Sequence, residues 1–515
     1  MNRQALTLAA VILGSSVVFL DATVVSVALE RIGSELPSGL FGVLEGQSYI
    51  VTAYLLALAS VLILAGAMAD LYGRRRMFLI GLAGFAASSA LCGLADSVEA
   101  LVGFRLVQGL FAAFLVPTSL AIISVSFSGA AAGRAYGIWT AASSVAFLLG
   151  PALGGLLVDS IGWRVVFWLN LPVAALAATL ALRYVAESRD ETHPGRLDWL
   201  GAAAVAAAVG GLAFGAIRGQ QSNWADPVGW LALAIGAVMT IALVPLMRLR
   251  PDPLIPPGLF ASRTFRAVNL STLLIYGSLT VNATTMAIFL QGTIGYTALA
   301  AGLTAVPGGL LLALLSTTIG ARAGRLGPRR FLVVGPLLMA AGYAWLARLP
   351  ESTPAWQARP ADPISLLPPA GFAVDVLPAL IVTGLGVAVL VAPLTQALMG
   401  SVPAQSAGLG SAINNAVSRV GPLLALALVF VAVTAAFYTA LADRLPGTDP
   451  ADAALRATIP PLSAPLVSLS DREAAAVRAS STDALHVAVL INAGLCVGGA
   501  LVNGWGLRPS RAEAV

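Results

Sequence analysis

Long apolar runs, separated by short polar loops, recur along the whole chain. A helix needs about 20 largely apolar residues to cross the hydrocarbon core of a membrane. Fourteen segments meet this requirement, roughly 5–29, 48–69, 77–95, 99–125, 134–158, 163–183, 198–217, 228–248, 267–291, 299–320, 330–349, 376–399, 408–439 and 484–507. Runs of this length, rich in Gly and Ala, indicate helices, because the strands of a membrane barrel alternate polar and apolar residues. The pattern predicts an all-α membrane protein with 14 transmembrane helices.

The composition agrees with a membrane protein, since 58% of the 515 residues are hydrophobic and 10% are charged. Soluble domains carry about 25% charged residues. The formal net charge is +5, every Lys or Arg residue is an arginine, and most of the arginines lie in or near short loops. That placement favours a topological role over nucleic-acid binding. Cys92 and Cys496 lie in separate apolar runs and the two histidines are far apart, so we expect neither a metal site nor a disulfide framework.

The arginines also orient the chain. If the N-terminus is cytoplasmic, the inside loops hold roughly twice as many arginines as the outside loops, as expected for cytoplasmic loops. Fourteen spans then return the C-terminus to the cytoplasm. We expect a multi-pass protein of the cell membrane, with its largest soluble excursion, an extracellular loop, at 440–483.

An internal repeat divides the chain. The segment GAMADLYGRRR (66–76) resembles GARAGRLGPRR (320–330), and each follows the second span of its half. Repeated six-helix halves are typical of secondary transporters. We therefore expect a six-helix bundle in 1–190, two linker helices in 191–262 and a second six-helix bundle in 263–515.

In the first half of the chain, two charged side chains lie well inside predicted spans. Asp21 belongs to the first span, in LDATVVSVALE, and Arg105 to the fourth. At 1.5 Å per helical residue, both lie roughly 10–12 Å below the outer surface. Charges inside a membrane are rare and usually face the bundle interior. Two interpretations stay open: Asp21 and Arg105 form a pair or share a polar network, or backbone and water satisfy each one separately.

The segment 66–76 combines glycines, an acid and arginines. Gly66 and Gly73 allow close helix approach and a tight turn. Asp70 can accept hydrogen bonds from Arg74 or from the start of a helix in the other half, which would hold an inward gate closed. Arg75 extends this basic run. In the alternative interpretation, the arginines only anchor the topology.

A fifth-span segment, LLGPALGGLL (148–157), contains a second glycine motif. Gly150 and Gly154 are four residues apart on one helix face, with Gly155 beside them, and form a small-residue packing surface. Pro151 frees a backbone acceptor and can bend the helix into a hinge. The alternative is a generic packing seam.

Polar residues in other spans are candidates for a substrate cavity. In GLGSAINNAVSRVGP (408–422), Asn415 and Arg419 share a helix face, and Asn414 precedes them. Arg419 lies about 15 Å into its span, and the C-terminal spans offer it no well-buried acid. The further candidates are Tyr54, Trp139 and Asn282. Each of these alone also fits a packing or anchoring role.

Four stretches resemble the major facilitator superfamily, in its fourteen-helix drug:proton antiporter group. GAMADLYGRRR resembles the family's loop between helices two and three, and FRLVQGLFAA (104–113) resembles its Arg-x-x-Gln-Gly segment in helix four. LLGPALGGLL resembles the antiport segment of helix five, and LDATVVSVAL the first-helix segment of the fourteen-helix exporters. The resemblance implies the major facilitator fold, with the two predicted linker helices between its halves.

The resemblance also implies a proton-coupled antiporter that exports small amphipathic compounds, such as drugs or antibiotics, by alternating access. Asp21 would carry the coupled proton beside Arg105. We expect a monomer that needs a small-molecule substrate, protons and a lipid bilayer, no cofactor beyond the proton gradient, and no nucleic acid. Export of a lipid or an endogenous metabolite is the alternative. A membrane-embedded sensor or enzyme is a further alternative, although the spans contain no metal-binding motif or nucleophile–base set.

Overall fold

The computed structural model describes residues 3–37, 43–190, 197–221, 226–359, 362–450, 452–465 and 467–507. Within these ranges the chain is helical, and its sole β-type pairing is an isolated bridge between Arg359 and Asp362. Helices are the expected solution, because a backbone in hydrocarbon must satisfy its hydrogen bonds within its own segment.

The helices follow one another along the whole chain. The first part contains α1 (Arg3–Glu35), α2 (Val43–Tyr72), α3 (Arg74–Gly93), α4 (Val98–Ser126), α5 (Gly129–Ser160), α6 (Arg164–Trp168) and α7 (Asn170–Tyr184). Then come α8 (Trp199–Gln221), α9 (Pro227–Arg248), η1 (Pro257–Ala261), α10 (Arg263–Phe289), η2 (Leu290–Ile294), α11 (Ala298–Leu303), α12 (Val306–Leu326) and α13 (Arg329–Leu346). The last part contains η3 (Pro363–Leu366), η4 (Phe372–Val376), α14 (Leu377–Gly400), η5 (Ala404–Ser406), α15 (Ala407–Arg444), α16 (Ala453–Thr458) and α17 (Asp471–Gly506).

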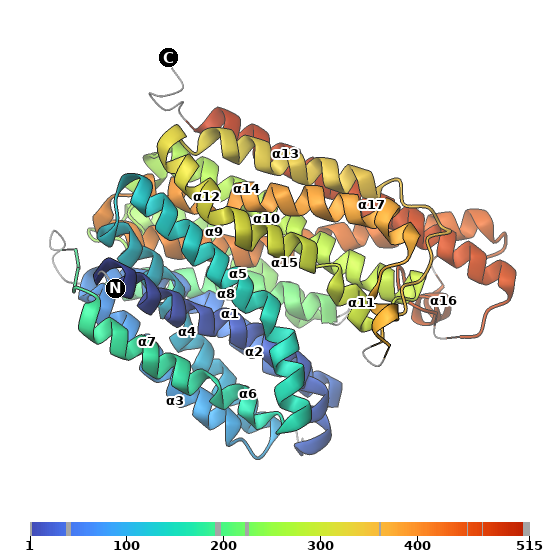
Figure 1. Cartoon of the computed structure of the whole chain (residues 1–515), viewed down its shortest axis with the longest axis horizontal. Helices are drawn as coiled ribbons and strands as arrows, with labels where there is room; N and C mark the ends of the chain where they lie inside the picture. The colour runs from blue at the N-terminus through green and yellow to red at the C-terminus, as the bar shows by residue number, and fades with distance from the viewer. Residues whose placement is uncertain are drawn as a thin grey trace.

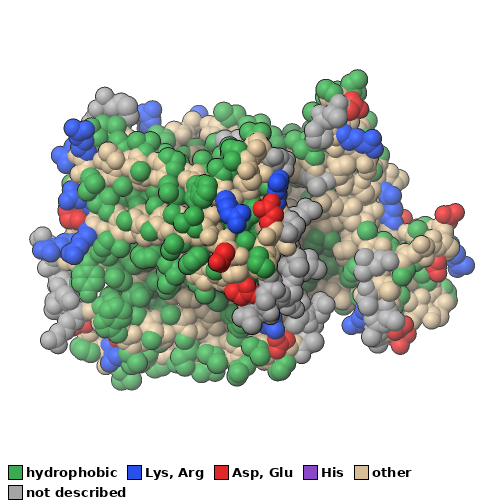
Figure 2. Space-filling view, turned by 90° about the horizontal axis from the view of Figure 1, so that it is seen from below, with side chains coloured by type: hydrophobic (Ala, Val, Ile, Leu, Met, Phe, Trp, Pro, Cys, Tyr) green, Lys and Arg blue, Asp and Glu red, His purple; other side chains and the backbone are tan. Residues whose placement is uncertain are grey.

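Twelve helical segments of the described chain are long and apolar enough to cross a membrane. Two of the fourteen predicted spans are not among them, those in α5 and α13. Most helices run along the long axis of the molecule, and α1 begins near the end at which α17 finishes (Figure 1). Hydrophobic side chains cover the middle of the surface in Figure 2, and arginines gather at its left end. This distribution is that of a multi-pass membrane protein.

Each region of the chain packs mainly on its sequence neighbours. In the first region, α1 packs on α5 and α7, α2 packs on α4, and α3 packs on α4 and α7. In the last region, α10 packs on α17 and α15, and α13 packs on α14 and α17. The most extensive contacts between the two regions are those of α5 with α12 and of α2 with α15. The functional side chains described below lie at or near the α2–α15 contact.

Helices α8 and α9 form a close hairpin, which also touches the rest of the molecule through α8 on α2 and α15. Small residues permit the close approach of the two helices. A Cβ atom on Gly215 would lie 2.6 Å from the backbone nitrogen of Leu233. At one end of the hairpin, Arg218 bonds the Asp226 carboxylate at 2.7 Å and the Tyr49 hydroxyl of α2 at 2.6 Å. The Val228 N–H and the Arg218 guanidinium lower the pKa of Asp226, so this contact stays ionised at neutral pH.

The predicted loop 440–483 is shorter than the sequence pattern suggested. Helix α15 continues to Arg444, and α17 already begins at Asp471. Ser470 and Glu473 form a capping box at the start of α17, and Arg444 pairs with Asp483 of α17 at 2.6 Å. Hydropathy marks only the apolar part of a helix, whereas helical hydrogen bonding and capping continue beyond it.

Candidate functional site

Asp21 of α1 lies at the centre of a buried polar network. Its Oδ2 accepts a hydrogen bond from Arg105 Nη1 of α4 at 2.5 Å. Its Oδ1 accepts from Gln108 Nε2 at 3.1 Å and from Asn170 Nδ2 at 3.0 Å. All four side chains are at most 1% exposed. The carboxylate is thus held by one guanidinium and one amide from α4 and by one amide from α7, away from water.

Arg105 is held on every side. Besides Asp21, its guanidinium donates to Gln108 Oε1 at 2.7 Å and to the Ile50 carbonyl at 3.2 Å. Its Cζ atom lies 4.1 Å from the centre of the Tyr54 ring, a cation–π contact. These partners fix the guanidinium against the carboxylate, so Asp21 and Arg105 form a pair within a shared network.

Sequence reasoning did not select Gln108 and Asn170 as site residues. Gln108 follows Arg105 by three positions and therefore shares its helix face, which is a signal that could have identified it. Asn170 begins α7 and also donates to Ser89 Oγ at 3.0 Å. No local pattern in WRVVFWLNLP marks it, because its role depends on how α7 packs against α1 and α3.

Asp70 joins two distant parts of the chain. Its carboxylate accepts from Arg74 Nε and Nη2 at 3.0 and 2.8 Å. It also accepts from the backbone N–H groups of Gly408 and Leu409, at 3.0 and 2.8 Å, at the start of α15. Ser406, the residue at the N-cap of α15, makes no side-chain cap bond. Asp70 therefore caps α15 from α2, where a carboxylate also favours the helix dipole.

Arg74 completes this contact from the start of α3. Its Nη2 donates to the carbonyls of Ala404 and Gln405, which precede α15. Arg74 is only 2% exposed. The Asp70–Arg74 pair thus bonds both the first amides of α15 and the carbonyls just before it, so the end of α2 is held against the start of α15. We call this contact of Asp70 and Arg74 with residues 404–409 the lock.

Glycines make the lock sterically feasible. A Cβ atom on Gly66 would lie 2.5 Å from the Gly408 carbonyl and 2.5 Å from Ala412 Cβ. Gly73 has φ +111°, which L side chains rarely adopt. The turn that it forms lets the N–H groups of Arg75 and Arg76 donate to the Glu187 carboxylate, each at 3.0 Å.

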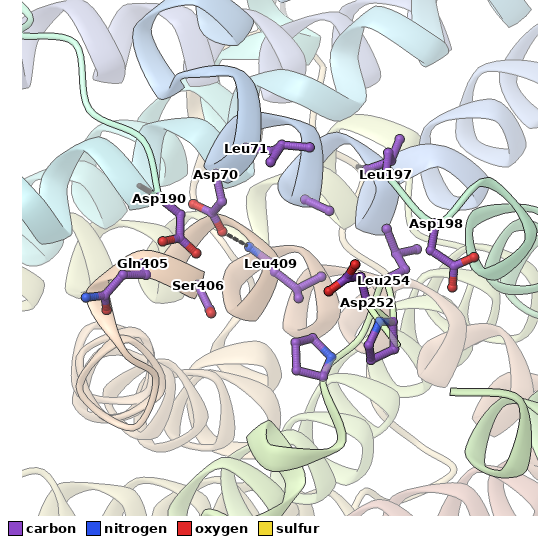
Figure 3. Close-up of a pocket in the computed structure, with 13 residues that line it drawn as sticks. Asp70, Leu71, Asp190, Leu197, Asp198, Asp252, Leu254, Gln405, Ser406 and Leu409 are labelled. Carbon is purple, nitrogen blue, oxygen red and sulfur yellow. Dashed lines mark hydrogen bonds between the residues drawn. The ribbon is translucent and has the colours of Figure 1, made fainter. Parts of the chain in front are cut away.

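A small cavity of about 70 Å³ adjoins this lock (Figure 3). Four aspartates line it, together with Gln405, Ser406 and Leu409: Asp70, Asp190, Asp198 and Asp252. Asp198 pairs with Arg250 at 3.2 Å, and the Asp190 N–H donates to the Asp70 carbonyl at 2.7 Å. Among the residues that the structure describes, no group of three His, Cys, Asp or Glu side chains could hold a metal ion.

The glycine motif of α5 lies against α1. A Cβ atom on Gly150 would lie 1.8 Å from Thr23 Oγ1, and one on Gly154 would lie 3.0 Å from Val24. A Cβ atom on Gly155 would lie 3.9 Å from Val27 Cγ1, at ordinary van der Waals distance. Pro151 belongs to the same helix, and its side chain lies outside the described part. This close contact between α5 and α1 lies within one helical turn of Asp21, because Thr23 and Val24 follow Asp21 in α1.

The polar candidates of α15 lie on the other side of the α2–α15 contact. Asn414 donates to Asn269 Oδ1 at 3.2 Å and to Thr272 Oγ1 at 2.9 Å, both in α10. Asn415 donates to the Ser411 carbonyl at 3.0 Å. Arg419 is half-buried and takes part in none of the ion pairs found among the described residues.

The remaining candidates differ in their surroundings. Tyr54 is fully buried beside Arg105, and its hydroxyl has no hydrogen-bond partner within the described chain. Trp139 of α5 donates to Ser15 Oγ at 2.8 Å and packs edge-on against Phe19, so it joins α5 to α1. Asn282 of α10 has a buried Oδ1 atom with no partner in the same described set.

Comparison with known proteins decides the family. Residues 11–426 match the sequence profile of the Major Facilitator Superfamily. The chain belongs to the major facilitator superfamily. Multidrug resistance protein Stp of Mycobacterium tuberculosis (strain CDC 1551 / Oshkosh) is 36% identical over 436 residues, 83% of this chain and 76% of Stp. Puromycin resistance protein pur8 of Streptomyces alboniger is 33% identical over 441 residues, 84% of this chain and 82% of pur8.

A solved structure has the same superfamily fold. The crystal structure of the human organic anion transporter MFSD10 (TETRAN) aligns with a TM-score of 0.64. The alignment covers 98% of this chain and 100% of that chain at 14% sequence identity. At this identity the likeness shows the fold alone, which is the all-helical major facilitator fold.

Proposed function

We propose that this superfamily member is a proton-coupled antiporter that exports small amphipathic drugs or antibiotics across the cell membrane. Relatives named as multidrug and puromycin resistance proteins, at 36% and 33% identity, support drug export. The observation that carries the coupling is the buried network around Asp21, the one carboxylate of the described chain that is buried at the level of Arg105. The proton gradient is the energy source, and the chain acts as a monomer without a cofactor.

Asp21 is the proton carrier in this proposal. A buried carboxylate that accepts three hydrogen bonds can be neutralised only if its donors rearrange. Proton binding would release Arg105 from Asp21, and substrate or a conformational change would then compete for the guanidinium. Coupling arises because α1 and α4 cannot keep their present contact in both protonation states.

Alternating access would follow from movement at the α2–α15 lock. We propose 14 transmembrane helices, the twelve apolar segments together with α5 and α13, which pack among them. They form two six-helix bundles, 1–190 and 263–515, joined by the linker pair in 191–262, with both termini in the cytoplasm. The Asp70–Arg74 contact on α15 would then close the cytoplasmic entrance in an inward-closed state.

Transport in reconstituted vesicles tests the proposal. The protein is placed in proteoliposomes with an imposed pH gradient and a pH-sensitive dye inside, and puromycin and a panel of amphipathic antibiotics are added in turn. We expect substrate addition to dissipate the gradient, and an uncoupler to abolish substrate accumulation. Expression in a pump-deficient host identifies the compounds to test. If no compound that the host resists moves protons in vesicles, the antiport mechanism is wrong.

A further inference from the structure

Arg419 is a cation without a matching acid. It lies about a third of the way along α15, and within the described chain it forms no ion pair and donates no hydrogen bond. The acids that are buried in the described structure are Asp21, Asp70 and Asp190, and each has other partners. An unpaired charge inside a membrane protein is unfavourable, and such residues usually mark substrate or ion pathways.

Helix geometry places Arg419 at the same depth as Tyr54. Helices α2 and α15 meet at Gly66 and Gly408, and from there both run toward the same end of the molecule. Tyr54 precedes Gly66 by 12 positions, and Arg419 follows Gly408 by 11. At 1.5 Å per residue, the two lie about 18 and 16 Å from the crossing. They therefore reach the same depth on neighbouring helices, and the Tyr54 hydroxyl lies within electrostatic range of Arg419.

Tyr54 is consequently influenced by two guanidinium groups, those of Arg105 and Arg419. Its ring face lies 4.1 Å from Arg105 Cζ, while its buried hydroxyl lacks a hydrogen-bond partner in the described structure. A fully buried hydroxyl is normally hydrogen-bonded, because leaving it unsatisfied is costly. The tyrosine hydroxyl thus provides a donor next to the unpaired cation.

The charges of this central region do not balance. Asp21 compensates Arg105 at 2.5 Å, which leaves the positive charge of Arg419. Asn415 lies one helical turn before Arg419 on the same face and adds a polar amide. A cationic ligand would meet two arginines and one carboxylate that is already fully engaged. An anionic ligand would meet one free guanidinium and one free hydroxyl.

We propose that the exported substrates are acidic amphipathic compounds whose carboxylate, or similarly acidic hydroxyl, binds the Arg419 guanidinium and the Tyr54 hydroxyl. This inference rests on the proposed exporter function and specifies its substrate class. The apolar part of the ligand would lie along the surrounding hydrophobic helix faces. The substrate anion would also lie close to Arg105, on the far face of the Tyr54 ring, and so would weaken the hold of Arg105 on Asp21.

Matched ligands test this assignment. The purified full-length protein in nanodiscs is titrated with pyrenebutyrate and with its uncharged amide, pyrenebutyramide, and with a panel of further acid and amide pairs of antibiotic size. We expect the acid to bind more tightly in the pairs that bind. Arg419→Gln should weaken acid binding about 10- to 100-fold, the effect of losing a charged hydrogen bond, and change amide binding less than about twofold. Arg419→Lys should keep part of the preference.

Arg322→Gln, an exposed arginine of α12, is the matched control and should change neither ligand. The assignment is overturned if no acid binds, if acid and amide bind alike, or if Arg419→Gln weakens both equally. Binding needs no gradient, so it is independent of coupling. A charge preference without proton movement in vesicles would refute the antiporter and leave the assignment intact, whereas proton-coupled export of amides alone would refute the assignment and leave the antiporter intact.

Discussion

Replacing Asp70 with asparagine should open the lock between α2 and α15. The substitution keeps the size of the side chain but removes its charge and one acceptor oxygen. The carboxylate now accepts four hydrogen bonds, two from Arg74 and two from the first amides of α15. An amide nitrogen in place of one oxygen would face an N–H group and leave Arg74 without its counter-ion.

The size of the effect follows from the contacts that are lost. Removing a helix N-cap costs about 0.5–2 kcal/mol, and losing a hydrogen bond between charged groups costs about 1.5–3 kcal/mol. Since asparagine keeps one acceptor, we expect a loss of about 2–4 kcal/mol. The population ratio of lock-closed to lock-open molecules should fall by a factor of about 30 to 700.

Distances between spin labels measure this ratio. Labels are attached to cysteines at Arg76 and Arg325, which are exposed and lie near the lock end of α3 and α12, after Cys92 and Cys496 have been replaced by alanine. The Asp70→Asn variant should shift the distance distribution toward longer separations.

Asp198→Asn is the matched control, because Asp198 lines the same cavity but pairs with Arg250 rather than with α15. If the Asp70→Asn distribution equals that of the parent protein, the carboxylate does not hold the lock. If Asp198→Asn shifts it equally, the general charge of the cavity, and not the cap on α15, is responsible.

Three further substitutions follow from the same contacts. Gly66→Val should also favour the open lock in the spin-label experiment, since a Cβ atom would lie 2.5 Å from a backbone oxygen of α15; an unchanged distribution would refute this. Asp21→Asn should abolish proton-coupled efflux in vesicles, and should lower yield and thermal stability because it leaves Arg105 unpaired. Adding Arg105→Gln should restore yield and thermal stability, because the unpaired arginine is removed, but should not restore coupling. If the double variant recovers proton coupling, the Asp21–Arg105 pair has only a structural role. Gly150→Ala should lower the melting temperature by several degrees, because its Cβ would overlap a threonine hydroxyl of α1 at 1.8 Å. Gly155→Ala should leave the melting temperature unchanged. Equal melting temperatures of the two variants would show that α5 does not pack tightly on α1 at Gly150.

The helical fold could be predicted from the sequence, because hydrocarbon allows few alternatives to apolar helices. The contact between Asp21 and Arg105 was also within reach, since helix rise alone places them at equal depth. The contribution of Asn170 was not, because depth does not say which face of α7 meets α1. Likewise, the glycines of 66–76 suggested a close approach, but only the packing of α2 on α15 shows that Asp70 supplies the cap that Ser406 does not.

Helix ends outside the apolar segments were the least predictable part. The start of α17 at Asp471 depends on the capping box of Ser470 and on the pair between Arg444 and Asp483. These are hydrogen bonds in an aqueous environment, and hydropathy does not register them. The absence of an acid near Arg419, by contrast, was visible in the sequence of the C-terminal spans, and the structure adds that Tyr54 lies at a similar depth on the neighbouring helix α2.

The hairpin of α8 and α9 has a mechanical consequence. Helix α8 contacts both α2 and α15, so it lies along the seam where the two bundles would move. Its end is bonded to α2 through Arg218 and Tyr49 at 2.6 Å. During rocking, α8 should travel with α2 and slide along α15. The α8–α9 pair would then stay in contact with both bundles as they rotate, and would keep lipid out of the interface between them.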